Sequence, residues 1–337
     1  MPYHMRWGIL SVLLIILIIV DLSLGSVDIP LADVFNILLG NAGSNPIYTD
    51  IVWEFRVTKA LTCILTGSAL SIGGLQMQTL FRNALAGPDV LGLSSGASLA
   101  VSLLLMSQAA GFQIFSNPSP WSIVIASSLG AGSVFVIILF VARRLGDNTS
   151  LLIIGLMIGA AAASLVSVLQ FLSKAEDQQA YLLWTFGSLG TLNWTEIQIL
   201  CFILSLGIFI GMISVKALNA WLLGDNYARS VGVNIDRSRL FIILSASILT
   251  GGVTAFCGPI AFVGLAVPHL TKLVIRTHNH RTLFPAVIIG GAILMLFCDV
   301  VAQLPGTSYV LPINAITALM GAPVVIWIVL RAKRISI

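Results

Sequence analysis

The side chains that most often carry out chemistry are few in this chain, and their spacing does not form a catalytic or metal-binding group. The four histidines are His4, His269, His278 and His280, and none has a carboxylate at ligand spacing. The sequence has no HExxH or GxSxG motif, and no GxxxxGKS or GxxxxGKT stretch that would hold nucleotide phosphates. We therefore expect no catalytic residue, no metal site, no cofactor and no ATP hydrolysis by the chain itself. We expect His4, His278 and His280 to be solvated, and His269 to have a hydrogen-bonded structural role.

The cysteines also lack a chemical arrangement. Cys63, Cys201, Cys257 and Cys298 all lie in apolar runs, and none has a CxxC partner. Such spacing predicts neither a disulfide framework nor a metal site. We expect all four to be small buried side chains.

Acidic residues are nearly absent from the apolar runs. Asp21 and Asp299 are the only acids near them, and both lie towards the outer ends of their runs. Ion-coupled transporters usually carry ionisable groups inside the membrane, where these groups bind the coupling ion. A stand-alone ion-coupled secondary transporter is therefore an alternative that only the interrupted spans described below support.

Composition indicates the fold class. The 337 residues are 58% hydrophobic and 9% charged, against about 25% charged in soluble domains. A membrane-spanning helix needs about 20 apolar residues, so ten spans would use most of the chain as a single transmembrane domain, residues 1–337. We predict an all-α polytopic membrane protein. The ten apolar runs lie near residues 7–24, 59–80, 91–109, 121–142, 150–172, 195–215, 238–257, 260–276, 283–303 and 311–331.

The distribution of basic residues predicts the orientation of these spans. With the N-terminus in the cytoplasm, only Arg56, Lys59 and Lys174 of the 17 Lys and Arg residues fall outside. Cationic loops stay in the cytoplasm during insertion, so both termini are expected there. The net charge of +4 reflects this anchoring, and we expect no nucleic-acid partner.

Glycine and proline mark several local features. Pro30 and Gly40 bracket a predicted short amphipathic helix at the outer interface. Small residues recur at helical spacing in 67–74 and 155–164, which favours close helix packing. Pro and Gly in 257–269 and in Gly321-Ala322-Pro323 predict interrupted spans, as expected along a transport pathway. The outer loops near 110–120, 173–194 and 304–310 are expected to be short and polar or Pro-rich.

The longest cytoplasmic loop, from Val215 to Arg239, contains a second predicted short helix. Asp225 is its expected N-cap and Gly232 its expected C′ residue. The apolar Trp221, with Leu222, Leu223 and Val231, would give this loop an apolar surface. Spacing alone leaves two interpretations open: a loop packed on the bundle, or a docking helix for a cytoplasmic partner.

Five segments together resemble the permease subunits of the metal-chelate ABC importers, the FecCD-type family that carries iron-siderophores, haem and vitamin B12. These segments occur in the same order as in the family. They are residues 22–40, 55–97, 222–235, 258–274 and 311–331.

The resemblance implies a type II ABC importer permease fold with ten transmembrane helices. It implies a homodimer in the lipid of a bacterial inner (plasma) membrane. The implied partners are two copies of a cytoplasmic ABC ATPase and a periplasmic or extracellular substrate-binding protein. ATP would be bound by the ATPase, so the chain would be a transport subunit without enzymatic activity of its own.

The resemblance also implies functional residues. Thr149 and Ser150 match the cytoplasmic gate, and Arg56 and Lys59 match basic positions that dock the binding protein. The sequence departs from the family at Lys59, where Arg is common, which keeps the charge but loses the bidentate geometry. Thr58 replaces a common Pro, and Gln303 replaces an Arg of some relatives. Within the coupling segment, 219–235, the helix that contacts the ATPase would comprise Asp225, Asn226, Tyr227, Ala228, Arg229, Ser230, Val231 and Gly232.

The cargo is expected to be a metal chelate or a metal oxyanion. The cargoes of the family are iron-siderophores, haem and cobalamin, and some members import molybdate or tungstate. Over its whole length this chain most resembles the oxyanion-importing type. Alternating access driven by the separate ATPase would move the cargo into the cytoplasm.

Overall fold

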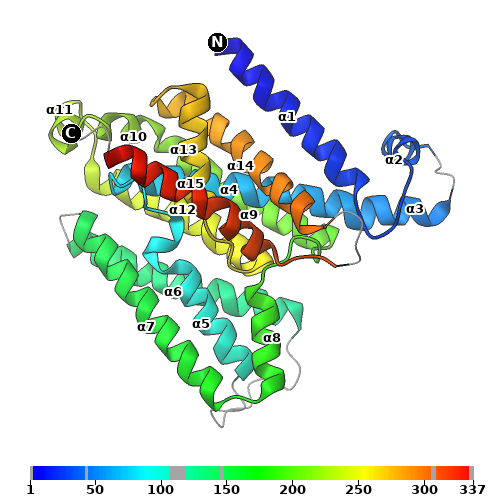
Figure 1. Ribbon diagram of the computed structural model, residues 1–337. Helices are drawn as coiled ribbons and strands as arrows, with labels where there is room; N and C mark the ends of the chain where they lie inside the picture. Colours follow the sequence, from blue (N-terminus) through cyan, green and yellow to red (C-terminus); the bar gives the residue numbers. More distant parts are fainter. Residues whose placement is uncertain (1–2, 42–44, 107–118, 145–147, 305–308, 334–337) are drawn as a thin grey trace.

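The computed structural model describes residues 3–41, 45–106, 119–144, 148–304 and 309–333, and within these ranges the chain is helical and contains no strand. Long helices joined by short connections pack side by side (Figure 1). The elements are α1 (Tyr3–Ser23), α2 (Leu31–Leu38), α3 (Pro46–Asp50), a π-helical segment (Ile51–Val57), α4 (Thr58–Leu80), a 3-10 turn (Pro88–Leu91), α5 (Leu93–Met106), α6 (Pro120–Arg144), α7 (Asn148–Leu172), α8 (Ala175–Thr185), α9 (Trp194–Ile213), α10 (Val215–Trp221), α11 (Asp225–Ser230), α12 (Ile235–Cys257), α13 (Val263–Ile275), α14 (His280–Ala302) and α15 (Ile313–Lys333).

The predicted apolar runs coincide with helices. Within the described residues, seven helices are long and apolar enough to cross a membrane: α1, the continuous Pro46–Leu80 helix, α6, α7, α9, α12 and α14. Three further apolar helices, α5, α13 and α15, are shorter over their apolar parts. The all-α polytopic class is therefore confirmed, and the count of ten crossings stays a prediction.

Helix α4 is the centre of the packing. It contacts α9, α12, α13 and α14, and most of its residues are buried. A Cβ atom added at Gly67 would lie 2.2 Å from the carbonyl oxygen of Gly291 on α14, and one at Gly74 would lie 1.8 Å from that of Gly264 on α13. The close approach predicted for residues 67–74 is therefore confirmed, because only hydrogen fits at these crossings.

Hydrogen bonds between helix ends show that α1 runs from one end of the bundle to the other. The Arg6 guanidinium donates to the carbonyl of Ile275 at 2.7 Å, which joins the start of α1 to the end of α13. The Arg56 guanidinium donates to the carbonyl of Leu22 at 2.8 Å, which joins the end of α1 to the segment before α4. We call the first end, which also carries α10 and α11, the α11 end. The other, which carries α2 and α3, is the α2 end (Figure 1).

The predicted helix after Pro30 and the interruption after Cys257 are confirmed, the interruption of the last span is wrong, and one helix was not predicted. The helix after Pro30 is α2, and Gly40 follows it with φ of 82°. The outer loop 173–194 contains the unpredicted helix α8. Helix α15 is continuous through Gly321 and Pro323. The interruption in 257–269 is confined to residues 258–262, because α13 begins at Val263 and continues through Pro268.

The wrong prediction at Gly321 has a packing explanation. A Cβ atom added at Gly321 would lie 2.4 Å from the Cβ atom of Phe262. Phe262 itself has φ of 67° and directly precedes α13. Glycine at 321 therefore accommodates this bulky neighbour and does not break α15.

We predict that Gly67→Ala destabilises the fold by about 1–3 kcal/mol, because the new methyl group cannot fit against Gly291 without separating α4 from α14. Gly132→Ala on α6 is the matched control, since a Cβ atom there meets nothing within 4 Å. The thermal unfolding midpoint in detergent should fall for Gly67→Ala only. Equal midpoints for the two variants would contradict this account of the crossing.

Candidate functional site

The predicted coupling segment forms two short helices, α10 and α11, at one end of the bundle (Figure 1). Gly224, with φ of 106°, precedes α11, and Gly232, with φ of 80°, follows it. The expected position of Gly232 is thus confirmed. Asp225 was expected as the N-cap and is instead the first helical residue, because Gly224 takes the cap position. The side chain of Asp225 lies outside the described part of the chain.

The coupling segment has one buried and one exposed face. Ala228 and Trp221 are buried and pack in a cluster that includes Leu218 and Ile235. The expectation that Trp221 contributes to an apolar surface is therefore wrong. The exposed residues of the segment include Leu222, Leu223, Asn226, Tyr227, Arg229, Ser230, Val231 and Gly232. This outward surface combines apolar groups with one cation, which suits a protein contact.

A polar cluster anchors α10 to the bundle. The His280 side chain is 1% exposed. Its Nε2 atom lies 2.9 Å from the Thr79 hydroxyl, and its Nδ1 atom lies 3.0 Å from Oδ1 of Asn219. The prediction that His280 is solvated is therefore wrong, because this side chain joins α4, α10 and α14. The expected hydrogen bond of His269 is not present at its buried Nδ1, which has no partner among the described residues.

The predicted gate residues lie in the first turn of α7. Thr149 is exposed and Ser150 is half-buried. The preceding Asn148 donates a hydrogen bond from Nδ2 to the carbonyl of Leu80 at 2.5 Å. The start of α7 is therefore fixed to the end of α4 at the α11 end of the bundle, and Thr149 points away from the protein interior.

At the opposite end, both predicted docking cations already have partners in this chain. Arg56 is 4% exposed. Its guanidinium donates hydrogen bonds to the carbonyls of Leu22, Ser23 and Val27. It therefore ties the segment after α1 to the helix that continues into α4. That Arg56 docks a binding protein stays a prediction. In this conformation the side chain also has a structural role.

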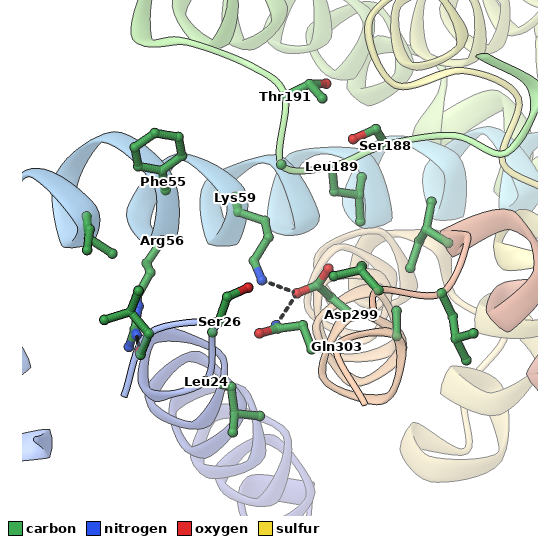
Figure 2. A pocket seen from close by; sticks show the side chains of 18 of the residues that line it. Leu24, Ser26, Phe55, Arg56, Lys59, Ser188, Leu189, Thr191, Asp299 and Gln303 are labelled. Carbon is green, nitrogen blue, oxygen red and sulfur yellow. Dashed lines mark hydrogen bonds and ion pairs between the residues drawn. The ribbon is translucent and has the colours of Figure 1, made fainter. Parts of the chain in front are cut away.

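Lys59 belongs to a buried polar group that sequence reasoning did not bring together. Its Nζ atom lies 2.9 Å from Oδ2 of Asp299. Nε2 of Gln303 donates to the same oxygen at 2.7 Å and to Oδ1 of Asp21 at 3.1 Å. Figure 2 shows Lys59, Asp299 and Gln303 converging from two helices. Asp21 and Asp299 lie near the ends of α1 and α14, as expected, but only the folded chain places them beside Lys59.

This group forms one wall of a pocket of about 540 Å³ at the α2 end. The pocket is also lined by Arg56 and by the segment 187–191 between α8 and α9 (Figure 2). Arg56, Lys59 and Asp299 already have partners within the chain, whereas Asp28 is an exposed carboxylate of the lining. Many of the other lining residues are apolar, Phe55 and Leu311 among them.

The cysteines follow the sequence prediction with one exception. Cys63, Cys257 and Cys298 are buried, whereas Cys201 is exposed. Cys201 lies on α9, many of whose side chains point away from the bundle. The expectation that it is buried is therefore wrong for the isolated chain.

We predict that Lys59→Met destabilises the protein by about 3–5 kcal/mol, because it leaves Asp299 buried without its cation. Adding Asp299→Asn should restore most of the loss, since the uncompensated charge is removed. Lys174→Met, at an exposed cation of the same end, should change stability by less than about 0.5 kcal/mol. Thermal unfolding of Lys59→Met, Asp299→Asn, the double variant and Lys174→Met tests this, and strictly additive effects of the two substitutions would refute the pairing.

Comparison with known proteins shows which family this chain belongs to. Residues 13–331 match the model of the FecCD transport family. The chain is 33% identical to the hemin transport system permease protein HmuU of Yersinia pestis, over 96% of each protein. It is 34% identical to the vitamin B12 import system permease protein BtuC of Salmonella paratyphi A, over 84% of each.

A solved structure extends the match to three dimensions. The inward-facing conformation of a metal-chelate type ABC transporter aligns with a TM-score of 0.83 and 26% identity, over 98% of this chain and 100% of that one. Sequence and fold agree. The chain therefore belongs to the FecCD transport family and is a transmembrane permease of the metal-chelate ABC importer type.

Proposed function

We propose that this chain, as a homodimer, forms the membrane pathway of an importer that carries a metal chelate of the haem or cobalamin class into the cytoplasm. The observation that carries the proposal is the match over nearly the whole chain to permeases named for hemin and vitamin B12. The import of molybdate or tungstate, which the whole-chain resemblance favoured, is the competing cargo in the experiment below.

The exposed faces of two helices support a second copy of the chain. Exposed positions of α7 include a stretch of small residues, Ala160, Ala163, Ser164 and Ser167, as well as large apolar side chains such as Phe171, which is 88% exposed. Those of α9 include Phe202, which is 73% exposed, and other large apolar side chains. Large apolar side chains suit lipid, whereas small residues suit close helix contact or a lined pathway. We therefore place α7, and with it the gate residues Thr149 and Ser150, at the dimer axis and α9 at the lipid.

The coupling segment supports a mechanical link to a separate ATPase. The distribution of basic residues predicts that this segment lies in the cytoplasm. Its exposed apolar residues would then be covered by a partner protein and not by the membrane. Closure of an ATPase dimer would move α11, and the buried cluster of Asn219, His280 and Thr79 would transmit that movement to α4 and α14. Rocking of the two permease chains would then open the pathway to each side in turn.

Delivery from outside is assigned to a substrate-binding protein that docks at the α2 end. The predicted contacts are Arg56 and Lys59. The binding protein can drive the cycle only if it contacts one conformational state better than the other. Release of Lys59 from Asp299 would provide such a difference between states.

The coupling proposal predicts that Leu223→Ser reduces copurification of the cognate ATPase by about tenfold, because Leu223 is 67% exposed on the apolar surface that directly precedes α11. Leu39→Ser, a similarly exposed leucine at the α2 end, is the control and should have no effect. Light scattering should show two permease chains and two ATPase chains in the purified complex. Undiminished ATPase binding by Leu223→Ser and by a deletion of 225–232 would overturn the assignment of this segment.

The cargo proposal predicts ATP-dependent uptake of haem or cobalamin by proteoliposomes that hold the permease, its ATPase and its binding protein. Ferric siderophore and molybdate are tested side by side with them under identical conditions. Accumulation of molybdate alone would show that the cargo is the oxyanion and not a metal chelate. Accumulation by the permease without ATPase, driven by an ion gradient, would instead establish the secondary transporter.

A further inference from the structure

A basic pocket of about 550 Å³ lies beside the exposed face of the coupling segment and shares Arg229 with it. It is formed by the end of α6, by α11 and by the start of α12. Its floor is apolar, with Leu139, Ala142 and Leu240 among the lining residues. The charged residues that line it are Arg143, Arg144, Arg229, Asp236, Arg237 and Arg239. Five cations and one anion thus line a volume typical of small-molecule sites.

The positive charge of this pocket is not neutralised by the described side chains around it. Arg143, Arg144, Arg229 and Arg237 are all exposed, and no ion pair joins any of them to Asp236 in the described part of the chain. Asp236 lies in the first turn of α12, where the helix dipole already favours its negative charge. Arg239 is buried and has contacts of its own within the protein. The four exposed guanidinium groups therefore suit a ligand with phosphate oxygens.

The pocket is continuous with the apolar surface of α6. Val136, Ile137 and Phe140 are exposed on this helix within two turns of Arg143. The guanidinium of Arg144 lies 4.6 Å from the centre of the Phe140 ring. An ordinary basic residue at the end of a membrane helix extends to the headgroup region by itself. Here arginines from three separate elements converge beside an apolar strip. This arrangement is complementary to a lipid, whose anionic headgroup would face the arginines and whose acyl chains would lie on the strip.

We propose that this pocket binds the phosphate group of an anionic glycerophospholipid of the inner leaflet, with the acyl chains lying along α6. Basic pockets between membrane helices on the cytoplasmic side are known to hold anionic headgroups. The proposal rests on the proposed orientation, in which the α11 end lies in the cytoplasm. Because Arg229 belongs to α11, the bound lipid would link the coupling helix to the ends of α6 and α12.

The test is native mass spectrometry of the purified permease, titrated with phosphatidylglycerol and, separately, with phosphatidylcholine of the same acyl chains. We expect retention of phosphatidylglycerol only, and an affinity about tenfold lower in the Arg143→Gln/Arg144→Gln variant. The Lys216→Gln/Arg281→Gln variant removes the same charge from two exposed cations at the same end and should bind phosphatidylglycerol like the unaltered chain. Unfolding midpoints verify that all proteins are folded.

Four outcomes would overturn the proposal. Equal retention of both lipids would show that the acyl chains alone account for binding. Equal losses in the two double variants would show general attraction to the basic end. Displacement of phosphatidylglycerol by millimolar inorganic phosphate would show a site for free anions. Loss of ATPase binding by Arg143→Gln/Arg144→Gln with unchanged lipid binding would assign the pocket to the ATPase contact, and this result would leave the proposed importer function intact.

Discussion

Hydrocarbon offers no hydrogen-bond partner, so every polar group that this chain places inside the membrane must be satisfied by the chain itself. Helix α4 meets this constraint largely on its own. The hydroxyl groups of Thr62, Thr66, Ser71 and Thr79 each donate to the carbonyl four residues earlier. These side chains are therefore buried without requiring a polar partner on another helix. The glycines among them leave the surface of α4 flat, and four neighbouring helices can approach it closely.

Two further hydrogen bonds of α4 to its neighbours lie near the coupling segment. Gln76 donates to the hydroxyl of Ser245 on α12 at 3.0 Å, and Gln78 to the carbonyl of Leu265 on α13 at 3.1 Å. Both residues, with Thr79, lie in the half of α4 that is nearer to the coupling segment. A displacement of α10 consequently reaches α4 through polar bonds. Further along α4, the crossing at Gly67 combines close glycine packing with one hydrogen bond, from the Ser68 hydroxyl to the carbonyl of Ile288 at 3.1 Å.

The sequence was sufficient to predict the long helices because each contains a long apolar run, and the length of such a run does not depend on which other helices pack against it. It also predicted α2 and the glycine after α11, since turn residues act locally. It could not predict the partners of side chains that lie far apart in the chain. His280 follows a polar stretch and looked solvated, yet Asn219 and Thr79 surround it. Similarly, Trp221 was assigned to a surface because nothing in its vicinity along the chain indicates the cluster that covers it. Gly321 and Pro323 looked like a helix break because the contact with Phe262 is invisible to local patterns.

The outer polar group changes what docking requires in this permease. A carboxylate of a binding protein that approaches Lys59 must compete with Asp299, which already holds the cation at 2.9 Å. Removal of Lys59 from this pair would leave Asp21 and Asp299 as neighbouring buried carboxylates with only Gln303 between them. Such an arrangement is unfavourable until α1 and α14 separate or a proton is taken up. Docking through Lys59 would therefore act directly on the contact between α1, α4 and α14, and α4 and α14 are the two helices that the His280 cluster connects to α10 at the far end.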